Sequence, residues 1–197
     1  RRGGVGRLLR DGGGHDDADV RALVAAAIED MGRIDVVINN AGLGGEVDIV
    51  DMSDDQWTAV LDITLNSVFR MTRAVLPHMM ERRSGVIVNN ASVLGWRAQE
   101  GQSHYAAAKA GVMALTRCVA MEVAEHGVRV NAVSPSLATH EFLAKVTPQG
   151  LLDQLTAREA FGRGAEPFEV ANVIVFLASD LASYMTGECV AVSSQHP

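Results

Sequence analysis

Apolar residues along this chain alternate between helical spacing and short runs of branched side chains. From Asp16 onward, apolar positions recur at helical spacing as far as Met31, and Gly32 then ends the pattern. The next run, residues 34–39, is short, rich in branched residues and followed by Ala-Gly, which is typical of a strand buried on both faces. The pattern therefore predicts a helix followed by a buried strand.

The same alternation continues to the end of the sequence. It predicts further helices over residues 53–82, 103–125, 149–160 and 167–178, and further strands over residues 86–90, 128–133 and 188–192. Ser53 and Gln56 have the spacing of a capping box, and Pro77 is expected to kink the first of these helices. Strands that alternate with helices imply right-handed crossovers and a parallel sheet covered on both faces. The expected fold class is α/β, a doubly wound parallel sheet.

Composition and charge argue against two classes of binding partner. The 197 residues are 48% hydrophobic and 21% charged, as in a soluble globular protein, and the net charge of -7 argues against nucleic acid or an anionic membrane as partner. No apolar run reaches the ~18 residues of a membrane span, and no secretory signal is visible, so a cytoplasmic location is expected. Cys118 and Cys189 lack metal-ligand spacing and are expected to be core residues, with no metal site.

The start of the chain differs from the rest. Residues 1–15 are rich in glycine and arginine and have no sustained apolar period, so we expect a flexible arm there. The remaining residues, 16–197, are expected to form one domain.

Tyr105 and Lys109 carry the clearest chemical signal. They are four residues apart, so a helix places them on one face, where the ammonium group favours the phenolate. Tyr105 also lies in the first turn, where the helix dipole favours an anion. Both effects are expected to lower the tyrosine pKa from about 10 and to make it a general acid/base. The neighbouring His104 and the later His140 are expected to be exposed loop histidines.

Two further segments are expected to meet this pair. Asn39, Asn40, Ala41 and Gly42 close one predicted strand, and Ser92 follows another. Because the carboxyl ends of parallel strands form the ligand crevice of such a sheet, we expect these segments to converge there.

The order of these motifs resembles the short-chain dehydrogenase/reductase family. The series NNAG, Ser92, YAAAK and NAVSP matches that family over roughly residues 19–193. The resemblance implies a Rossmann-like sheet and NAD or NADP as cofactor. It implies that Tyr105 exchanges a proton with the substrate oxygen, that Ser92 orients that oxygen, and that Lys109 lowers the tyrosine pKa and binds the nicotinamide ribose.

The resemblance also implies a set of cofactor contacts. Asn39, Ala41 and Gly42 would border the sugar of the cofactor, although an ordinary strand-to-loop turn would also favour these residue types. Pro135 and the backbone of Ala138 would lie against the nicotinamide carboxamide.

The sequence departs from the family in two places. Thr64 stands where the family has an asparagine, and its hydroxyl is expected to bond the preceding helical turn. Nothing before Asp19 matches the first two strands or the glycine-rich loop that holds the cofactor pyrophosphate. We therefore expect a partial, N-terminally truncated Rossmann-like fold in which strand 34–39 is an apolar sheet edge.

Two functions remain open at this stage. The first is an NAD(P)-dependent alcohol dehydrogenase or ketone reductase acting on a small molecule. The tail resembles actinobacterial members in lipid or steroid-ring breakdown, which implies a coenzyme A thioester, and 3-oxoacyl-thioester reduction is the alternative substrate. The second function is a noncatalytic fragment that associates through its long helices, as family members form homodimers or homotetramers.

Overall fold

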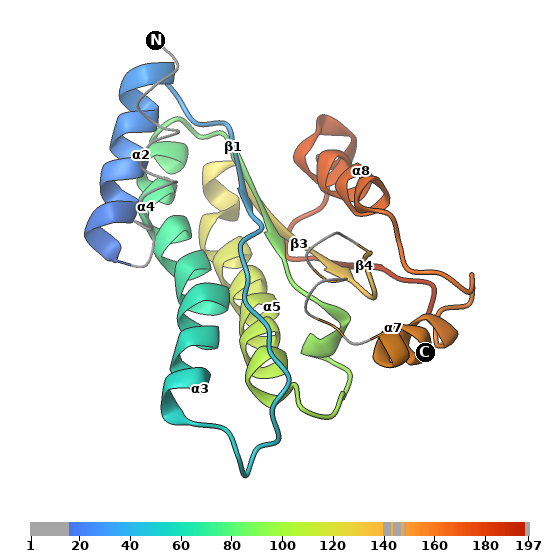
Figure 1. Ribbon diagram of the computed structural model, residues 1–197. Coiled ribbons are helices and arrows are strands. Elements are labelled where there is room, and N and C mark those ends of the chain that lie inside the picture. The colour runs from blue at the N-terminus through green and yellow to red at the C-terminus, as the bar shows by residue number, and fades with distance from the viewer. Residues whose placement is uncertain (1–15, 140–142, 144–146, 148, 196–197) are drawn as a thin grey trace.

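Four parallel strands form the centre of the part of the molecule that the structure describes (Figure 1). The computed structural model describes residues 16–139, 143, 147 and 149–195, so the predicted arm at residues 1–15 lies outside the described residues. The strands are adjacent in chain order: β1 (Val36–Asn39), β2 (Gly85–Asn90), β3 (Val128–Pro135) and β4 (Cys189–Val192). The predicted α/β class with a parallel sheet is confirmed.

Helices cover both faces of this sheet. Their bounds are α2 (Asp17–Met31), α3 (Asp54–Leu61), α4 (Ser67–Glu81), α5 (Ser103–Val123), α7 (Gln149–Ala157) and α8 (Pro167–Ala178). In the described part of the chain, no helix has the length and apolar character needed to cross a membrane. The predicted helix 53–82 is interrupted by a π-helix, Asp62–Asn66, although the predicted capping box of Ser53 and Gln56 is present. An apolar spacing pattern does not distinguish a single π turn from the α-helix around it.

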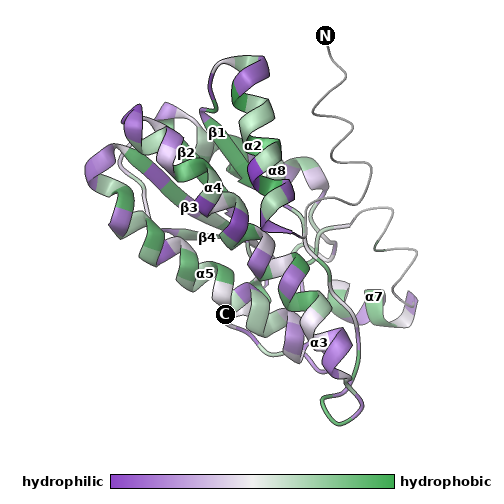
Figure 2. Ribbon diagram, turned by 90° about the vertical axis from the view of Figure 1, so that its left-hand side faces the viewer, coloured by the Kyte–Doolittle hydropathy of each residue, from purple (hydrophilic) through white to green (hydrophobic). Residues whose placement is uncertain are grey.

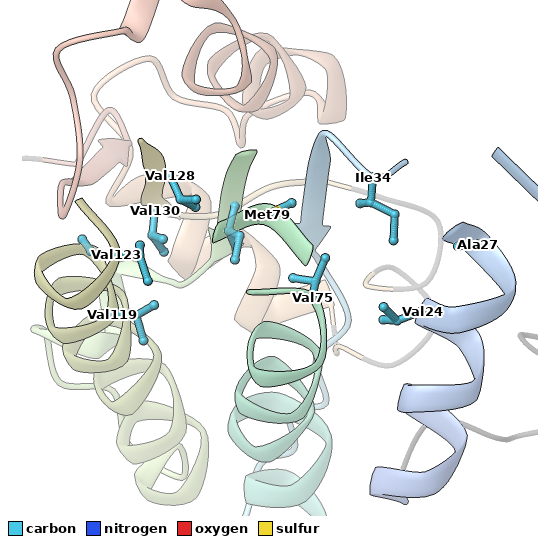
Figure 3. Close-up of a cluster of buried hydrophobic side chains, with 11 residues drawn as sticks. Val24, Ala27, Ile34, Val75, Met79, Val119, Val123, Val128 and Val130 are labelled. Atoms are coloured by element: carbon cyan, nitrogen blue, oxygen red, sulfur yellow. The ribbon is translucent and has the colours of Figure 1, made fainter. Parts of the chain in front are cut away.

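One face of the sheet is packed by α2, α4 and α5. Figure 3 shows their side chains pointing toward the strands, and Figure 2 shows the apolar strands behind the helices. The core on this face includes Val24, Ala27, Val75, Met79, Ile87, Val119, Val123, Val128 and Val130. Each large side chain buried in this way stabilises the fold by about 1.5–3 kcal/mol.

Helix α8 covers the opposite face of the sheet. Val88 follows Ile87 in β2, so its side chain points to the other face, where it packs with Val170 and Leu177 of α8. The strand order runs in one direction, yet α4 and α5 lie on one face and α8 on the other. The crossover from β3 to β4 therefore has the opposite hand to the first two, and the expectation of right-handed crossovers throughout is wrong. Strand β3 ends at Pro135, and α8 begins at Pro167 on the other face of the sheet.

Strand β1 is an edge of the sheet within the described residues, as expected from the family strand order. Its burial on both faces, expected from composition, is wrong, because Val36 and Ile38 are 40% and 49% exposed. These two residues point away from Val37, which packs on the core of α2 and α4. Helix α8 contacts β2, β3 and β4, and among the described residues it leaves Val36 and Ile38 on the second face of β1 partly exposed.

The two cysteines are less buried than their apolar neighbours in the sequence indicate. Cys118 lies on the exposed side of α5, and Cys189 is half-buried in β4. The expectation that both are core residues is wrong, because α5 presents one side to solvent at Cys118.

Candidate active site

The predicted chemical residues meet at the carboxyl end of the sheet. In the sheet register, Asn39 of β1 lies beside Asn89 of β2, and Pro135 of β3 lies beside Val192 of β4. Ser92 follows β2 by two residues at the same end. The expectation that these segments converge agrees with this register.

A chain of polar side chains fixes α5 against the first two strands. The Asn39 amide donates to Asn89 Oδ1 at 2.9 Å, and the Asn89 amide donates to Thr116 Oγ1 of α5 at 2.9 Å. Asn89 and Thr116 are 1% and 0% exposed. Buried hydrogen bonds of this kind hold elements in one arrangement, so they fix the height of α5 above the sheet. The side chain of Asn39 is therefore held against β2 by its hydrogen bond to Asn89.

Lys109 is a buried cation at the end of β2. Its side chain is 3% exposed, and Nζ donates to the carbonyl oxygen of Asn90 at 2.5 Å. Nζ also lies 5.5 Å from the centre of the Tyr105 ring. Burial lowers the pKa of Lys109 to about 8, because the charged form is poorly solvated there.

Tyr105 and Ser92 form the second part of the cluster. Burial raises the pKa of Tyr105, and hydrogen bonding with Ser92 offsets part of that rise. The expectation that Lys109 and the helix dipole lower this pKa is not met, because the largest effect on Tyr105 is its loss of solvation, which disfavours the phenolate. Ser92 is itself held in place, since it caps the short 3-10 helix Val93–Gly95 by accepting from the backbone N–H of Leu94 at 3.2 Å.

Residues 42–47, here called the cover segment, run along the first turns of α5. A Cβ atom placed on Gly42 would lie 3.4 Å from Lys109 Nζ, and one placed on Gly44 would lie 3.5 Å from the Tyr105 ring. The absence of side chains at these glycines lets the backbone approach the two functional groups. Ala41, just before the segment, is exposed.

Both ends of the cover segment are fixed by hydrogen bonds. Leu43 donates its N–H to Thr64 Oγ1 at 2.9 Å and accepts from the same hydroxyl at 3.0 Å, and Val47 donates to the carbonyl of Gly101 at 3.1 Å. The expectation that Thr64 bonds its own preceding turn is therefore wrong. The π-helix directs this fully buried side chain toward the segment after β1.

Replacing Thr64 with valine should destabilise the protein. Thr64→Val keeps the shape of the side chain but leaves both the N–H and the carbonyl of Leu43 without this partner, which should cost about 1–3 kcal/mol in unfolding free energy. Urea unfolding measures the effect, with Thr58→Val on the exposed side of α3 as matched control. Equal unfolding free energies for the two variants would show that the two hydrogen bonds contribute nothing.

His104 is buried, which corrects the expectation of an exposed loop histidine. It is 1% exposed in the first turn of α5, and a Cβ atom on Gly45 would lie 3.5 Å from its Nε2. Burial lowers the pKa of His104, which favours the neutral imidazole. His140 lies outside the described residues.

Glu159 connects the segments that follow β3 and β4 through hydrogen bonds. This carboxylate is 5% exposed and accepts from the N–H of Leu137 at 3.3 Å and from the Ser194 hydroxyl at 2.7 Å. Ala138 lies one residue beyond Leu137 and bridges to Ala165. The backbone after Pro135 is therefore held by groups from later in the chain.

The structure thus brings together Ser92, Tyr105 and Lys109, and it places Gly42 beside them. Sequence reasoning missed Glu159, for which no local signal exists, because its partners come from distant segments. It also missed the contacts of Gly44 and Gly45 with α5, although two adjacent glycines directly after a strand are a signal for close backbone approach. In the part of the chain that the structure describes, no three potential metal ligands cluster.

Comparison with known proteins identifies the family of the chain. The family model described as enoyl-(acyl carrier protein) reductase matches residues 15–194. The chain belongs to the short-chain dehydrogenase/reductase family of oxidoreductases.

Individual relatives are reductases or dehydrogenases. The chain is 64% identical over 181 residues to (5R,7aS)-5-hydroxy-7a-methyl-1-oxo-2,3,5,6,7,7a-hexahydro-1H-indene-carboxyl-CoA reductase of Mycobacterium tuberculosis, covering 91% of this chain and 69% of the relative. It is 40% identical to the 3-oxoacyl-(acyl-carrier-protein) reductase FabG of Thermotoga maritima, covering 90% and 72%. A crystal structure of a short chain dehydrogenase from Mycobacterium smegmatis matches with a TM-score of 0.79 and 56% identity, covering 93% and 68%.

Proposed function

We propose that this protein interconverts a secondary alcohol and a ketone by hydride transfer, with Tyr105 as general acid/base. The observation that carries the proposal is the clustering of a phenol, a hydroxyl and a buried ammonium group on Ser92, Tyr105 and Lys109. The Tyr105 phenol can supply a proton to the substrate oxygen. Ser92 can donate a hydrogen bond, and Lys109 can supply a positive charge, as that oxygen becomes negative during the reaction. Nicotinamide dinucleotide chemistry, NAD or NADP, supplies the hydride when the cofactor is bound.

The residues that face the nicotinamide side fit such a cofactor. Lys109 Nζ lies beside the bare backbone of Gly42, where a ribose hydroxyl can accept from the ammonium group. Asn39 and Ala41 border the same sugar, Asn39 by its backbone because its side chain is bonded to Asn89. Pro135 and the backbone of Ala138 would contact the carboxamide. Within the described residues, the proposed contacts involve the nicotinamide half of the dinucleotide.

The three side chains divide the proton chemistry among them. A raised pKa keeps the Tyr105 phenol protonated at neutral pH, so it is able to donate to a ketone oxygen during reduction. Ser92 donates to the same oxygen and orients it, and the Lys109 cation stabilises the phenolate that remains. In oxidation the same groups act in reverse, with the phenolate accepting the proton of the alcohol.

The substrate we propose is a ring-bearing ketone or alcohol carried as a coenzyme A thioester. The Mycobacterium tuberculosis relative has that class of substrate in its name, and its 64% identity exceeds the 40% identity of the Thermotoga maritima 3-oxoacyl reductase. Reduction of a linear 3-oxoacyl thioester is the second candidate, supported by the latter relative.

We further propose that two copies of the chain pair through α4 and α5, giving a homodimer or a homotetramer. Met121 of α5 and Phe69 of α4 are 81% and 42% exposed, and apolar surface on long helices favours helix packing between copies.

A titration of the purified chain with NADH and with NADPH tests the proposed function. We expect saturable binding, seen as a change in nicotinamide fluorescence, and oxidation of the bound cofactor on adding a ring-bearing ketone thioester. Turnover with a linear 3-oxoacyl thioester alone would select the second substrate. No binding of either cofactor at millimolar concentration would contradict the catalytic proposal for this polypeptide and leave self-association as its remaining role.

A further inference from the structure

His104 is a buried polar residue that the chemistry proposed above does not use. Its side chain is 1% exposed, and Nδ1 has no hydrogen-bond partner among the residues described. A buried polar atom without a partner destabilises the folded state, so an apolar ring of similar size would be the more stable choice. Because Nδ1 makes no hydrogen bond to the described residues, the contribution of His104 comes from the contacts of its ring.

The cover segment connects His104 to Tyr105. Gly44 lies on the Tyr105 ring and Gly45 lies on the His104 ring, each 3.5 Å from the nearest ring atom when measured from the Cβ position. The two rings are consecutive in α5, and the two glycines are consecutive in the segment. Each ring therefore supports one peptide of the same short stretch of backbone.

Between its two anchored ends, this stretch of backbone is supported by the side chains of α5 beneath it. Thr64 holds Leu43 on one side, and Gly101 holds Val47 on the other. Between these anchors, Gly44 and Gly45 make no backbone hydrogen bond to any residue that the structure describes, and they rest on the two rings. Removal of the ring of His104 would let Gly45 sink and would loosen the contact of Gly44 with Tyr105.

We propose that His104 is a positioning residue for Tyr105. Its ring supports Gly45, keeps Gly44 against the phenol ring and thereby holds the phenol beside Ser92. The inference rests on the proposed function for the role of Tyr105, but the contact itself does not depend on catalysis. Lys109 on α5 lies beside Gly42, and Glu46 on the cover segment lies beside Gly101.

A tyrosine titration tests this role without any need for turnover. The chain has two tyrosines, and Tyr184 is fully exposed, so Tyr184→Phe leaves Tyr105 as the one tyrosine seen by ultraviolet absorbance. In this background, His104→Ala should lower the titration midpoint of Tyr105 by about half a pH unit or more, because water reaches the phenol. It should also lower kcat by about tenfold with a smaller change in KM.

Two variants make the result specific. His104→Phe keeps a ring under Gly45, so it should restore the midpoint and kcat to within about threefold of the parent, with a thermal stability at least as high. His126→Ala, in the short 3-10 helix that follows α5, should change neither quantity. An unchanged Tyr105 midpoint in folded His104→Ala would overturn the proposal.

A second change covers the case in which His104→Ala does not fold. Gly45→Val places a branched side chain against the imidazole and should lift the cover segment, which should also lower the Tyr105 midpoint. A midpoint equal to that of the parent would overturn the proposal here as well. A parent chain whose midpoint responds to these changes, yet which lacks turnover, would contradict the proposed function and leave the positioning role standing.

Discussion

Tyr105→Phe should reduce turnover by about 10²–10⁴-fold while leaving cofactor affinity within a few fold of the parent. The phenol is the proton donor in the proposed reaction, and the ring packed under Gly44 remains after the change. Steady-state kinetics on the ketone thioester and nicotinamide fluorescence measure the two quantities separately.

The control for this change is Tyr184→Phe. Tyr184 is fully exposed near the end of α8, and its loss should alter neither turnover nor binding. Turnover in Tyr105→Phe equal to that of the control would show that another group transfers the proton.

Lys109→Met should make the protein more stable and less active at the same time. The folded-state pKa of Lys109 is about 8, below its ordinary value of 10.5, so burial of its charge costs about 3 kcal/mol below pH 8, where both folded and unfolded chains hold the proton. Methionine fills a similar space without that cost, and the gain is reduced because the carbonyl of Asn90 loses a donor. We expect a net rise of roughly 1–2 kcal/mol in unfolding free energy at pH 7.

The pH dependence identifies the source of this gain. Between pH 8 and pH 10.5 the unfolded chain holds a proton on Lys109 that the folded chain has released, so the contribution of this residue to stability rises with pH. The advantage of Lys109→Met over the parent should therefore shrink across that range in urea unfolding. Arg117→Met, which removes an exposed cation from the same helix, should show no such trend. A constant advantage at all pH values would contradict the assigned burial cost.

Much of the architecture could be read from the apolar pattern. The spacing predicted α2, α5 and α8 to within a few residues and all four strands, because each buries a regular stripe or run of side chains. The motif order likewise predicted that Ser92 and Tyr105 approach each other, because strand ends of a parallel sheet share one edge.

The remainder depended on contacts between distant segments. The hand of the last crossover depends on which face of the sheet α8 covers, and the spacing of apolar residues along the chain does not indicate that face. The rise in the Tyr105 pKa depends on burial of the phenol by the folded chain, which the spacing of Tyr105 and Lys109 does not reveal. The burial of His104 follows from the same cover, since a histidine at the start of a helix is otherwise free to face solvent.

The edge of β1 that faces away from β2 should be recognisable by amide hydrogen exchange. Asp35 directs its carbonyl toward β2, where it accepts from Val86, so the alternating peptide groups of Val36 and Ile38 point to the other side. Within the described residues no strand pairs there, so these two amides should exchange far faster than those of β2, which lie between two strands. Slow exchange at Val36 and Ile38 would instead show that this side of β1 is paired in solution.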